Sequence, residues 1–450
     1  MPKIGVVADD LTGATTTGVL LARSKARTAV FFNVGEAEGA EDLSALDAVL
    51  ISSSSRALAA DEAYRRVASA TEALKKMEVC YFSKRIDTTL RGGIGVEIDA
   101  MLDHLPEDTL AVVVPAMPQS RRIMVGGFSV IDNVALIRTP VAQDVRTPVT
   151  ENYIPKLIAG QTKRRTDLVT LETVLAGETA IKKALAGKAA AGAKVILADA
   201  VAIEDIDAIA RAAIALGRPI LAVDPGPFTA KLAFHRGLTE IEQPNIPDVQ
   251  PVSGKTVLIA AGSATPVTKR QMAVLCEDDR VAHIEVDPLA LIHGAETATA
   301  EIARAVEQTV ALLKQPRQPR AILLETALHG DLLDLDAEDR RHGYARGVSA
   351  NCINAGLGSI IAETLAQAGR DKVAGLYTTG GDTMVNVCYQ MGVGCIEVRD
   401  YVIPQTDIGC LTGAYAGLPI VGKGGLTGDD QIAGKIVDRL FLEAARQGEH

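Results

Sequence analysis

Short apolar runs alternate with helix-like segments along nearly the whole chain. In the first half the apolar runs are Ile4–Ala8, Thr28–Phe32, Ala48–Ser52, Val79–Ser83, Leu110–Val114, Val195–Ala198 and Ile220–Val223. Segments rich in alanine and leucine with helical spacing lie between them, such as Ala59–Lys75 and Ile203–Leu216. This alternation predicts a parallel β-sheet with helices on both faces.

A second series of the same kind follows a proline-containing segment. Residues 240–254 carry three prolines and little periodicity, which indicates a linker. The later runs are Thr256–Ala260, His283–Val286, Ala321–Thr326, Val373–Thr379, Gly394–Val398 and Pro419–Gly422. We predict an α/β protein of two domains, 1–240 and 255–450, joined by linker 241–254. Each domain would be a mainly parallel sheet flanked by helices, with the active site in the interdomain cleft. Within 117–150, two glycines and an alternating run predict an inserted hairpin.

The composition narrows the class of protein. The net charge is −10 and no basic run occurs, which argues against nucleic acid as a partner. No apolar run reaches about 18 residues, so no membrane span is expected. The six cysteines are scattered without a CxxC pair, and the first residues read as a strand rather than a signal peptide. We therefore expect a cytoplasmic protein, and a homodimer is compatible with the sequence.

The segment Lys84–Gly92 places cations at the end of a predicted strand. It reads KRIDTTLRG and follows the apolar run Val79–Ser83. Cations beside one carboxylate, Asp87, are costly to bury unless an anion accompanies them. Open α/β sheets bind ligands at the carboxyl ends of their strands. A surface ion-pair network is the alternative. We predict an anion site in which Asp87 is ionised and can accept a hydroxyl proton.

Two further strand ends carry polar groups suited to the same ligand. Asp9 and Asp10 point to different sides of the chain, so one can face a ligand while the other caps the next helix. Gly13 would let a ligand approach closely. Arg56 ends a run of serines, and a guanidinium binds a carboxylate through two hydrogen bonds. Both segments also suit ordinary helix caps, so the pattern alone does not decide between a ligand site and a structural cap.

Glycine-rich loops follow strands in the second half. The segment 379–383 (TGGDT) precedes a helical segment, and free N–H groups at a helix start attract anions. The segment 422–428 (GKGGLTG) ends the last run and adds one cation. We predict a nucleotide site formed by Ser263, Gly380, Gly381, Asp382, Thr383, Gly422 and Gly424. An anion site and a nucleotide site in one chain suggest phosphoryl transfer.

Motifs of other enzyme classes are missing. The segment 254–256 resembles the end of a P-loop, but Val249 stands where the first glycine is required. The Gly356-Leu357-Gly358 triplet lies in a helical pattern rather than after a strand, so it is not a Rossmann fingerprint. No pair of histidines has the spacing of a zinc motif.

Four motifs together resemble the four-carbon acid sugar kinase family. They are ADDLTGA (8–14), KRIDTTLRG (84–92), PAMP (115–118) with the Arg and Gly pairs that follow it, and TGGDT (379–383). They occur in order over nearly the whole chain. The chain departs from the family pattern at Thr15–Thr17, where an acidic residue is common, at Thr88, where serine is common, and at 423–428, where KSGxFG is frequent.

The resemblance implies an N-terminal acid-sugar-binding domain and a C-terminal nucleotide-binding domain. The implied activity is ATP-dependent phosphorylation of the terminal hydroxyl of a four-carbon sugar acid. D-threonate is the favoured substrate, with D-erythronate and 3-oxo-tetronate as alternatives. The implied substrate-binding residues are Asp9, Asp10, Arg56, Lys84, Arg85, Asp87, Thr88 and Arg91. Asp10 or, by slight preference, Asp87 would orient or deprotonate the hydroxyl. Mg²⁺ and the glycine loops would stabilise the transferring phosphoryl group, and the metal ligands are left open.

Two hypotheses that assign the chain to other classes of protein are less well supported. An NAD-dependent hydroxy-acid dehydrogenase would also combine an arginine-lined acid site with a nucleotide domain, but no GxGxxG follows a strand. A non-catalytic sugar-acid sensor would need no pair of carboxylates beside its ligand, and no DNA-binding segment is visible to report its signal.

Overall fold

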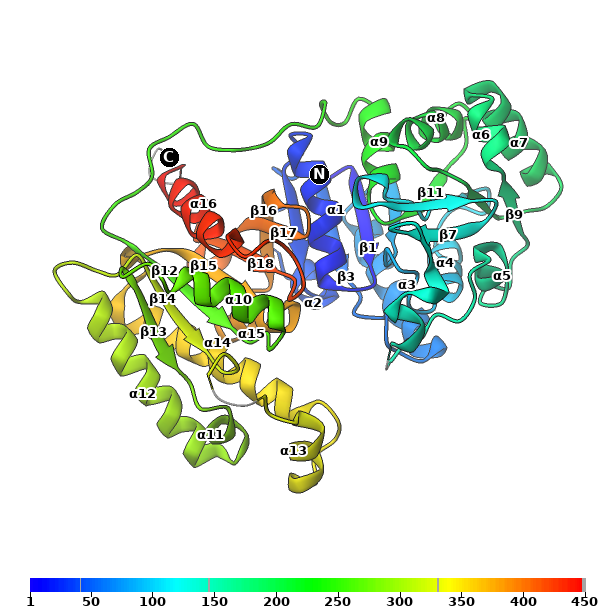
Figure 1. Cartoon of the computed structure of the whole chain (residues 1–450). Helices are drawn as coiled ribbons and strands as arrows, with labels where there is room; N and C mark the ends of the chain where they lie inside the picture. The colour runs from blue at the N-terminus through cyan, green and yellow to red at the C-terminus, as the bar shows by residue number, and fades with distance from the viewer. Residues whose placement is uncertain (41, 145, 330–331, 447–450) are drawn as a thin grey trace. The chain divides into compact units, whose positions relative to one another are not determined.

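The computed structural model describes residues 1–40, 42–144, 146–329 and 332–446. The chain forms two compact units, Met1–Pro244 and Asn245–His450 (Figure 1). Each unit is a mainly parallel sheet flanked by helices, so the predicted two-domain α/β fold is confirmed. The roles predicted for the two domains, and an active site between them, stay predictions. No helix in the described part of the chain is both long and apolar enough to span a bilayer.

The sheet of the first unit has the strand order β2-β3-β1-β4-β11-β5-β10-β9, and neighbouring strands run parallel. Its strands are β1 (Ile4–Ala8), β2 (Thr28–Phe31), β3 (Ala48–Ser52), β4 (Tyr81–Arg85), β5 (Leu110–Val113), β9 (Thr166–Val169), β10 (Val195–Ala198) and β11 (Ile220–Asp224). Most central strands are buried along their whole length, as expected when helices cover both faces.

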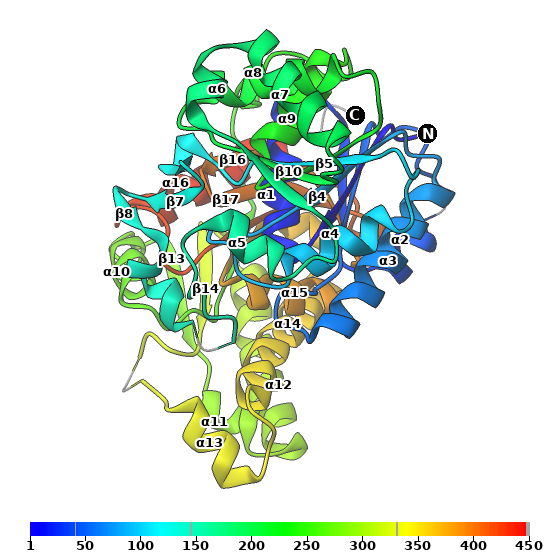
Figure 2. The same ribbon diagram turned by 90° about the vertical axis from the view of Figure 1, so that its right-hand side faces the viewer.

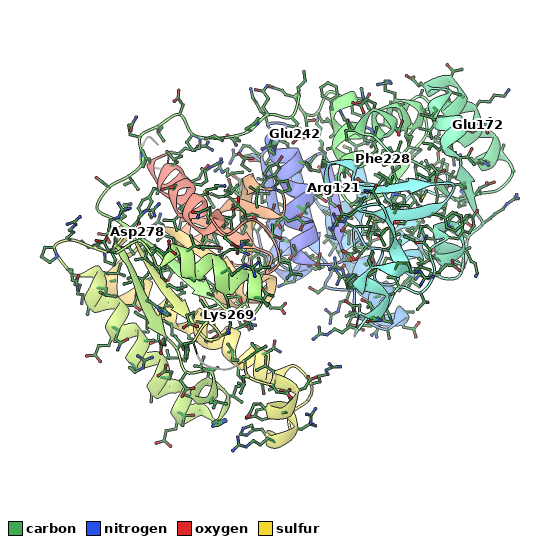
Figure 3. The ribbon with its side chains drawn as sticks, in the orientation of Figure 1. Arg121, Glu172, Phe228, Glu242, Lys269 and Asp278 are labelled. Carbon is green, nitrogen blue, oxygen red and sulfur yellow. The ribbon has the colours of Figure 1, made fainter. Side chains whose placement is uncertain are left out.

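Helices cover both faces of this sheet (Figure 2). They are α1 (Leu11–Arg23), α2 (Val34–Glu38), α3 (Ala60–Lys76), α4 (Ile94–Leu102), α5 (Ile154–Ala159), α6 (Leu171–Leu175), α7 (Glu178–Ala190), α8 (Ile203–Ile214) and α9 (Pro227–His235). Helices α1 and α9 pack together, as do α3 and α4. Phe228, at the start of α9, is fully buried in the core between the helices and the sheet (Figure 3).

The predicted hairpin is present as part of a small antiparallel sheet. It consists of β6 (Arg122–Val125), β7 (Phe128–Ile131) and β8 (Val134–Ala135). The turn between β6 and β7 uses Gly126 and Gly127, which both adopt positive φ angles, of 60° and 80°. Short 3₁₀ turns at Pro118–Ser120, Leu136–Arg138 and Pro140–Gln143 flank the small sheet.

The sheet of the second unit has the order β13-β14-β12-β15-β18-β17-β16. Its strands are β12 (Thr256–Ala261), β13 (Val281–Glu285), β14 (Ala321–Glu325), β15 (Val373–Thr379), β16 (Cys395–Ile403), β17 (Thr406–Leu411) and β18 (Pro419–Lys423). Strand β17 runs antiparallel to both of its neighbours. The sequence prediction missed this strand.

The helices of the second unit are α10 (Pro266–Leu275), α11 (Pro288–Ile292), α12 (Ala295–Leu313), α13 (Leu335–His342), α14 (Val348–Ala368), α15 (Gly381–Gln390) and α16 (Ile432–Arg446). Apolar side chains of α10 and α16 form a core with β12, β14, β15 and β18. The 3₁₀ turns Arg370–Lys372 and Gly413–Tyr415 precede β15 and β18.

Candidate functional site

Arg56 is the centre of an ion-pair cluster at the carboxyl ends of β1, β3 and β4. Its Nε and Nη2 donate to the two carboxylate oxygens of Asp9 at 2.7 and 3.1 Å. Its Nη1 lies 2.6 Å from Oδ2 of Asp10, and its Nη2 lies 3.7 Å from Oδ1 of Asp87. These strands are neighbours in the sheet, so their ends bring together groups that are distant in sequence.

Both carboxylate oxygens of Asp87 accept hydrogen bonds. Arg91 donates to it through Nε at 2.7 Å and Nη2 at 3.3 Å, and the hydroxyl of Thr89 donates at 2.5 Å. Burial alone would raise the pKa of Asp87, but the charge of Arg56 and the hydrogen bond from Arg91 outweigh burial and hold the pKa well below its usual range. Asp87 is therefore ionised at neutral pH, as the sequence predicted. Thr88, the predicted ligand beside it, is half-buried.

Arg85 packs against Gly13 and pairs with both carboxylates at the end of β1. Its Nη1 lies 3.2 Å from Oδ1 of Asp9 and 3.4 Å from Oδ1 of Asp10. A Cβ atom on Gly13 would overlap the Arg85 guanidinium. Gly13 is therefore needed for the packing of Arg85, which corrects the expectation that it admits a ligand. The buried Nε of Arg85 has no hydrogen-bond partner among the described residues, so this cation retains a free donor.

Lys84 is fully buried on the inner side of this cluster. Its Nζ lies 2.8 Å from Oε2 of Glu97 and donates to the carbonyl oxygens of Arg85 and Val7 at 2.8 and 3.4 Å. Oε1 of Glu97 accepts a hydrogen bond of 2.5 Å from Ser55. Because the ammonium protons have partners within the unit, Lys84 supports the strand ends. Direct substrate binding by Lys84, as predicted from sequence, does not agree with these contacts.

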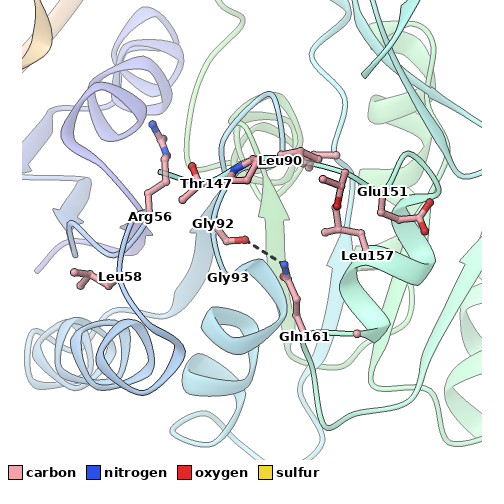
Figure 4. Close-up of a pocket in the computed structure, with 13 residues that line it drawn as sticks. Arg56, Leu58, Leu90, Gly92, Gly93, Thr147, Glu151, Leu157 and Gln161 are labelled. Carbon is pink, nitrogen blue, oxygen red and sulfur yellow. Dashed lines mark hydrogen bonds between the residues drawn. The ribbon is translucent and has the colours of Figure 1, made fainter. Parts of the chain in front are cut away.

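A cavity of about 360 Å³ opens beside Arg56 (Figure 4). Gly92, Thr147, Glu151 and Gln161 are among the residues that line it. Nε2 of Gln161 donates to the carbonyl oxygen of Gly92 at 3.2 Å. Gly92 has a φ of 92°, and a Cβ there would lie 3.1 Å from the carbonyl oxygen of Arg56. The cavity is large enough for a small metabolite.

Arg122, the first residue of β6, is a second cation with unused hydrogen-bonding capacity. Its Nη1 donates to the carbonyl oxygen of Ser120 at 2.7 Å, and its buried Nε has no partner among the described residues. Burial lowers the pKa of Arg122, and the charges of Asp132 and Asp87 offset this effect only in part. An anion bound near Arg122 would compensate the remaining desolvation of the guanidinium.

Three predicted loops meet at the strand ends of the second unit. The backbone N–H of Gly380 donates to the carbonyl oxygen of Lys423 at 2.9 Å, which joins the loops after β15 and β18. The hydroxyl of Thr265, after β12, donates to the carbonyl oxygen of Gly425 at 2.6 Å. The structure therefore brings Ser263, Gly380, Gly381, Asp382, Thr383, Gly422 and Gly424 into one region, at neighbouring strands.

Close backbone approach explains the glycines in these loops. Gly380 has a φ of 101°, which favours glycine. A Cβ on Gly425 would lie 2.6 Å from Oγ of Ser263. The N–H groups of Gly381, Asp382 and Thr383 form the first turn of α15, where backbone donors have no acceptor within the helix. This arrangement can bind a phosphate group.

Lys423 lies at the end of β18 beside this turn. Its side chain is buried, and Nζ donates only to the carbonyl oxygens of Gly424 and Thr427, at 2.8 and 3.3 Å. No carboxylate of the described residues lies within ion-pair distance of it. Burial lowers the pKa of Lys423 to about 8. A buried cation without a counter-ion favours an anionic ligand.

Sequence reasoning missed several residues that complete the two regions. Glu97, Asn354 and Thr265 lie in or beside helices, far in sequence from their partners. Thr383 donates through its hydroxyl to Oδ1 of Asn354 in α14 at 2.8 Å. Arg122 and Lys423 stand inside motifs that the sequence analysis quoted. Their buried charges without carboxylate partners become visible only in the folded chain.

Family models match both units. The model described as a sugar-binding N-terminal domain matches residues 4–232, and the model described as a nucleotide-binding C-terminal domain matches residues 258–433. The chain is 38% identical over 448 residues to a D-erythronate kinase of Heliobacterium modesticaldum, with 99% of each chain covered. The chain belongs to the four-carbon acid sugar kinase family. Members of this family are phosphotransferases with an alcohol group as acceptor, and so is this protein.

Two further similarities bear on the substrate and on the fold. A D-threonate kinase of Salmonella typhimurium is 29% identical over 431 residues, with 95% of this chain and 96% of the relative covered. A solved structure from Salmonella typhimurium LT2 has a TM-score of 0.79 at 22% identity and covers 99% of this chain and 100% of its own. The structural similarity supports the fold of the whole chain.

Proposed function

We propose that the first unit binds a four-carbon sugar acid at the ends of β1, β3 and β4, and that the second unit binds ATP at the loops after β12, β15 and β18. The observation that supports this proposal best is the Arg56 cluster. Asp9, Asp10 and Asp87 all meet one guanidinium, beside a cavity of about 360 Å³. Asp144, which lies 3.3 Å from Arg91, adds a fourth carboxylate. The charges of Arg56, Arg85 and Arg91 are therefore compensated, and ligand specificity rests on where free donors and acceptors remain.

The substrate carboxylate is proposed to bind Arg122 and Arg85. Both guanidiniums have a buried Nε without a partner among the described residues. Arg122 also has no carboxylate partner within ion-pair distance in the described part of the chain. A bound carboxylate would supply the missing acceptor, and charge-assisted hydrogen bonds of this kind are strong.

Replacing Arg122 with alanine is expected to raise KM for the sugar acid by roughly 10- to 100-fold, the effect of losing a charge-assisted hydrogen bond of about 1.5–3 kcal/mol. The melting temperature should change little because Arg122 forms no ion pair in the described structure. Arg121→Ala is the matched control, since the Arg121 side chain is 78% exposed and, among the described residues, pairs only with Asp132. Equal KM values in the two variants would contradict the assignment.

The reacting hydroxyl is proposed to hydrogen-bond to a carboxylate of the cluster. Asp10 has the most exposed side chain of the three, at 29%, compared with 3% for Asp9 and 6% for Asp87. Both oxygens of Asp10 and both oxygens of Asp87 already have partners, so occupancy does not separate the two carboxylates. Exposure thus favours Asp10 for direct contact, with Asp87 fixing Arg56 and Arg91. This ordering reverses the sequence-based preference, which rested on the cations that surround Asp87.

The nucleotide phosphates are proposed to bind the first turn of α15 and Lys423. The positive φ of Gly380 and the missing Cβ of Gly425 leave room for a phosphate at the backbone N–H groups. Mg²⁺ prefers oxygen ligands, and the exposed carboxylate of Asp382 fits this preference at the same turn. When bound, the ion would neutralise charge on the transferring phosphoryl group. The protein's own residues hold the phosphates and position the acceptor hydroxyl, which supplies most of the catalysis in phosphoryl transfer.

The affinity for ADP is expected to fall as the pH rises through about 8, the pKa of Lys423 before the ligand binds. A bound phosphate stabilises the charged form and raises this pKa, so binding takes up a proton above pH 8. The protonated fraction of the free lysine falls about tenfold between pH 7 and pH 9, and affinity should fall by about the same factor. Calorimetric titration of wild type and Lys423→Met measures this.

The matched control is Lys435→Met, which removes an exposed lysine that pairs with Asp429. It should keep the wild-type pH dependence, whereas Lys423→Met should bind weakly at every pH. A wild-type pH dependence in Lys423→Met would show that another group titrates.

D-erythronate is the substrate that sequence identity favours, because the D-erythronate kinase relative is 38% identical and the D-threonate kinase relative 29%. D-threonate, which the sequence motifs favoured, is the second candidate. Phosphorus NMR of the product tests the position of transfer. A phosphate on the terminal carbon couples to two protons and gives a triplet, whereas a phosphate on an inner carbon gives a doublet. A doublet would contradict transfer to the terminal hydroxyl.

A further inference from the structure

Two histidines and a glutamate converge in the second unit, away from the predicted nucleotide loops in sequence. Glu338 and His342 lie one turn apart on α13, and His293 directly follows α11. Figures 1 and 2 show α11 and α13 side by side. One possible ligand atom from each of the three residues lies within 4.8 Å of the other two. The sequence alone does not indicate this convergence, because His293 and His342 are far apart along the chain.

The contacts inside this cluster are too weak to explain it. Oε2 of Glu338 lies 3.4 Å from Nε2 of His293 and 3.5 Å from Nε2 of His342, longer than good hydrogen bonds. Its Oε1 lies 3.6 Å from Arg341. Nε2 of His342 is buried and has no hydrogen-bond partner among the described residues. The buried ring nitrogen of His342 therefore lacks a partner, which is rare in folded proteins, and Glu338 has only long contacts.

The same distances fit a bound metal ion. Zinc binds histidine nitrogen and carboxylate oxygen at about 2.0–2.2 Å, so ligand atoms around a tetrahedral ion are about 3.3–3.5 Å apart. The two separations from Oε2 of Glu338 match this spacing. His293 is the most exposed of the three, with 31% of its side chain accessible, so its ring can turn to complete the set. His342 stacks on Tyr344, at 5.3 Å between ring centroids, which fixes its orientation.

Helix α13 also lacks the usual means of attachment. The residues that it buries are Glu338 and Asp339, both carboxylates. The burial of Asp339 is explained by its hydrogen bonds, because its carboxylate accepts from the backbone N–H groups of Gly347 and Ser349 at the start of α14. Among the described residues, the Glu338 carboxylate meets only the longer contacts to His293, His342 and Arg341. An ion held by Glu338 would attach α13 to α11 where apolar burial does not.

We propose that His293, Glu338 and His342 bind a zinc ion that joins α11 to α13, with water at the fourth position. Two imidazole nitrogens favour Zn²⁺ over Mg²⁺, which requires oxygen ligands, so this ion is distinct from the metal that accompanies a nucleotide. Through Asp339 the ion stabilises the start of α14, the helix whose Asn354 contacts Thr383. The proposal does not depend on the identity of the substrate.

Zinc titration of the full chain, after removal of metals with EDTA, tests this site. We expect one tightly bound Zn²⁺ per chain by elemental analysis after gel filtration, unchanged by millimolar Mg²⁺. The melting temperature should rise by roughly 5 °C with excess Zn²⁺. Co²⁺ in place of Zn²⁺ should give the intense visible absorption of a tetrahedral site.

Three variants and a control separate this site from adventitious binding. His293→Ala and His342→Ala each remove a ligand, so they should weaken zinc binding by more than the roughly 10- to 100-fold that the loss of a residue supporting a ligand costs, and remove the thermal shift. Glu338→Gln keeps the shape of the side chain and removes its charge. It therefore tests whether the carboxylate contributes to zinc binding without creating a cavity. His104→Ala, a histidine of the first unit that contacts the carbonyl oxygen of Ala100, should bind zinc like wild type. Absence of stoichiometric zinc binding, or equal binding in all four variants, would overturn the proposal.

Discussion

Replacing Arg56 with alanine is expected to lower kcat/KM for the sugar acid by roughly 10²- to 10³-fold. Arg56 is the shared partner of Asp9, Asp10 and Asp87, and two of these carboxylates are almost fully buried. Removing one partner of a buried ion pair costs about 3–5 kcal/mol, because the remaining charge is left uncompensated. The carboxylates would then repel each other and move away from the substrate. Steady-state kinetics with saturating ATP measures the loss.

A second substitution keeps this test meaningful if Arg56→Ala folds poorly. Arg56→Lys retains the positive charge but cannot form the two hydrogen bonds to Asp9 at once. It should melt near the wild-type temperature and still lose roughly 10-fold or more in kcat/KM. Arg65→Ala is the control, since this arginine is 73% exposed on α3 and pairs with Glu62. Activity of Arg56→Ala within about threefold of wild type would show that the Arg56 cluster is not part of the substrate site.

Asp10→Asn is expected to lower kcat by roughly 10²- to 10⁴-fold with little change in KM, the range typical of losing a proton acceptor. Asparagine caps helices as well as aspartate does, so the hydrogen bond to the N–H of Gly13, 2.7 Å long, should survive. The variant keeps the helix cap but loses the ion pairs of Asp10 with Arg56 and Arg85, so a modest fall in melting temperature is expected. Single-turnover kinetics with enzyme in excess over the sugar acid separates the chemical step from substrate binding.

Asp87→Asn provides the contrast. It breaks the paired hydrogen bonds with Arg91, so it should lower the melting temperature and raise KM as well as lowering kcat. If Asp87 is the acceptor, as the sequence alone suggested, Asp87→Asn would show the isolated loss of kcat and Asp10→Asn would work nearly normally. The two variants therefore give opposite results under the two assignments.

The sheets could be predicted from the sequence because buried parallel strands are continuous apolar runs. β1, β3 and β15 begin and end where the runs do. β4 was placed two residues too early, since Lys84 and Arg85 do not read as strand residues. Their charges are buried because Glu97, Asp9 and Asp10 pair with them, and such pairing depends on contacts that are distant in sequence. β17 was missed because its buried apolar part, 408–411, is only four residues long and contains a glycine.

The candidate site could be predicted only as a set of strand ends. Motif residues such as Asp9, Arg56 and Asp87 were identified correctly as neighbours, because parallel strands end at one edge of the sheet. Which side chains face a ligand could not be predicted. Lys84 and Arg85 are consecutive, yet one is fully buried on Glu97 and the other keeps a free donor. The convergence of His293 with α13 likewise depends on how α11 packs.

The proposed activity is ATP-dependent phosphorylation of a four-carbon sugar acid. The most direct test is ADP release by the full chain with ATP, Mg²⁺ and a panel of D- and L-erythronate, D- and L-threonate and their 3-oxo forms. We expect strong turnover with one acid of the panel, with D-erythronate the first candidate and D-threonate the second. Nucleotide binding without ADP release for any acid would contradict the proposed acceptor. Absence of nucleotide binding would contradict the proposed kinase activity itself.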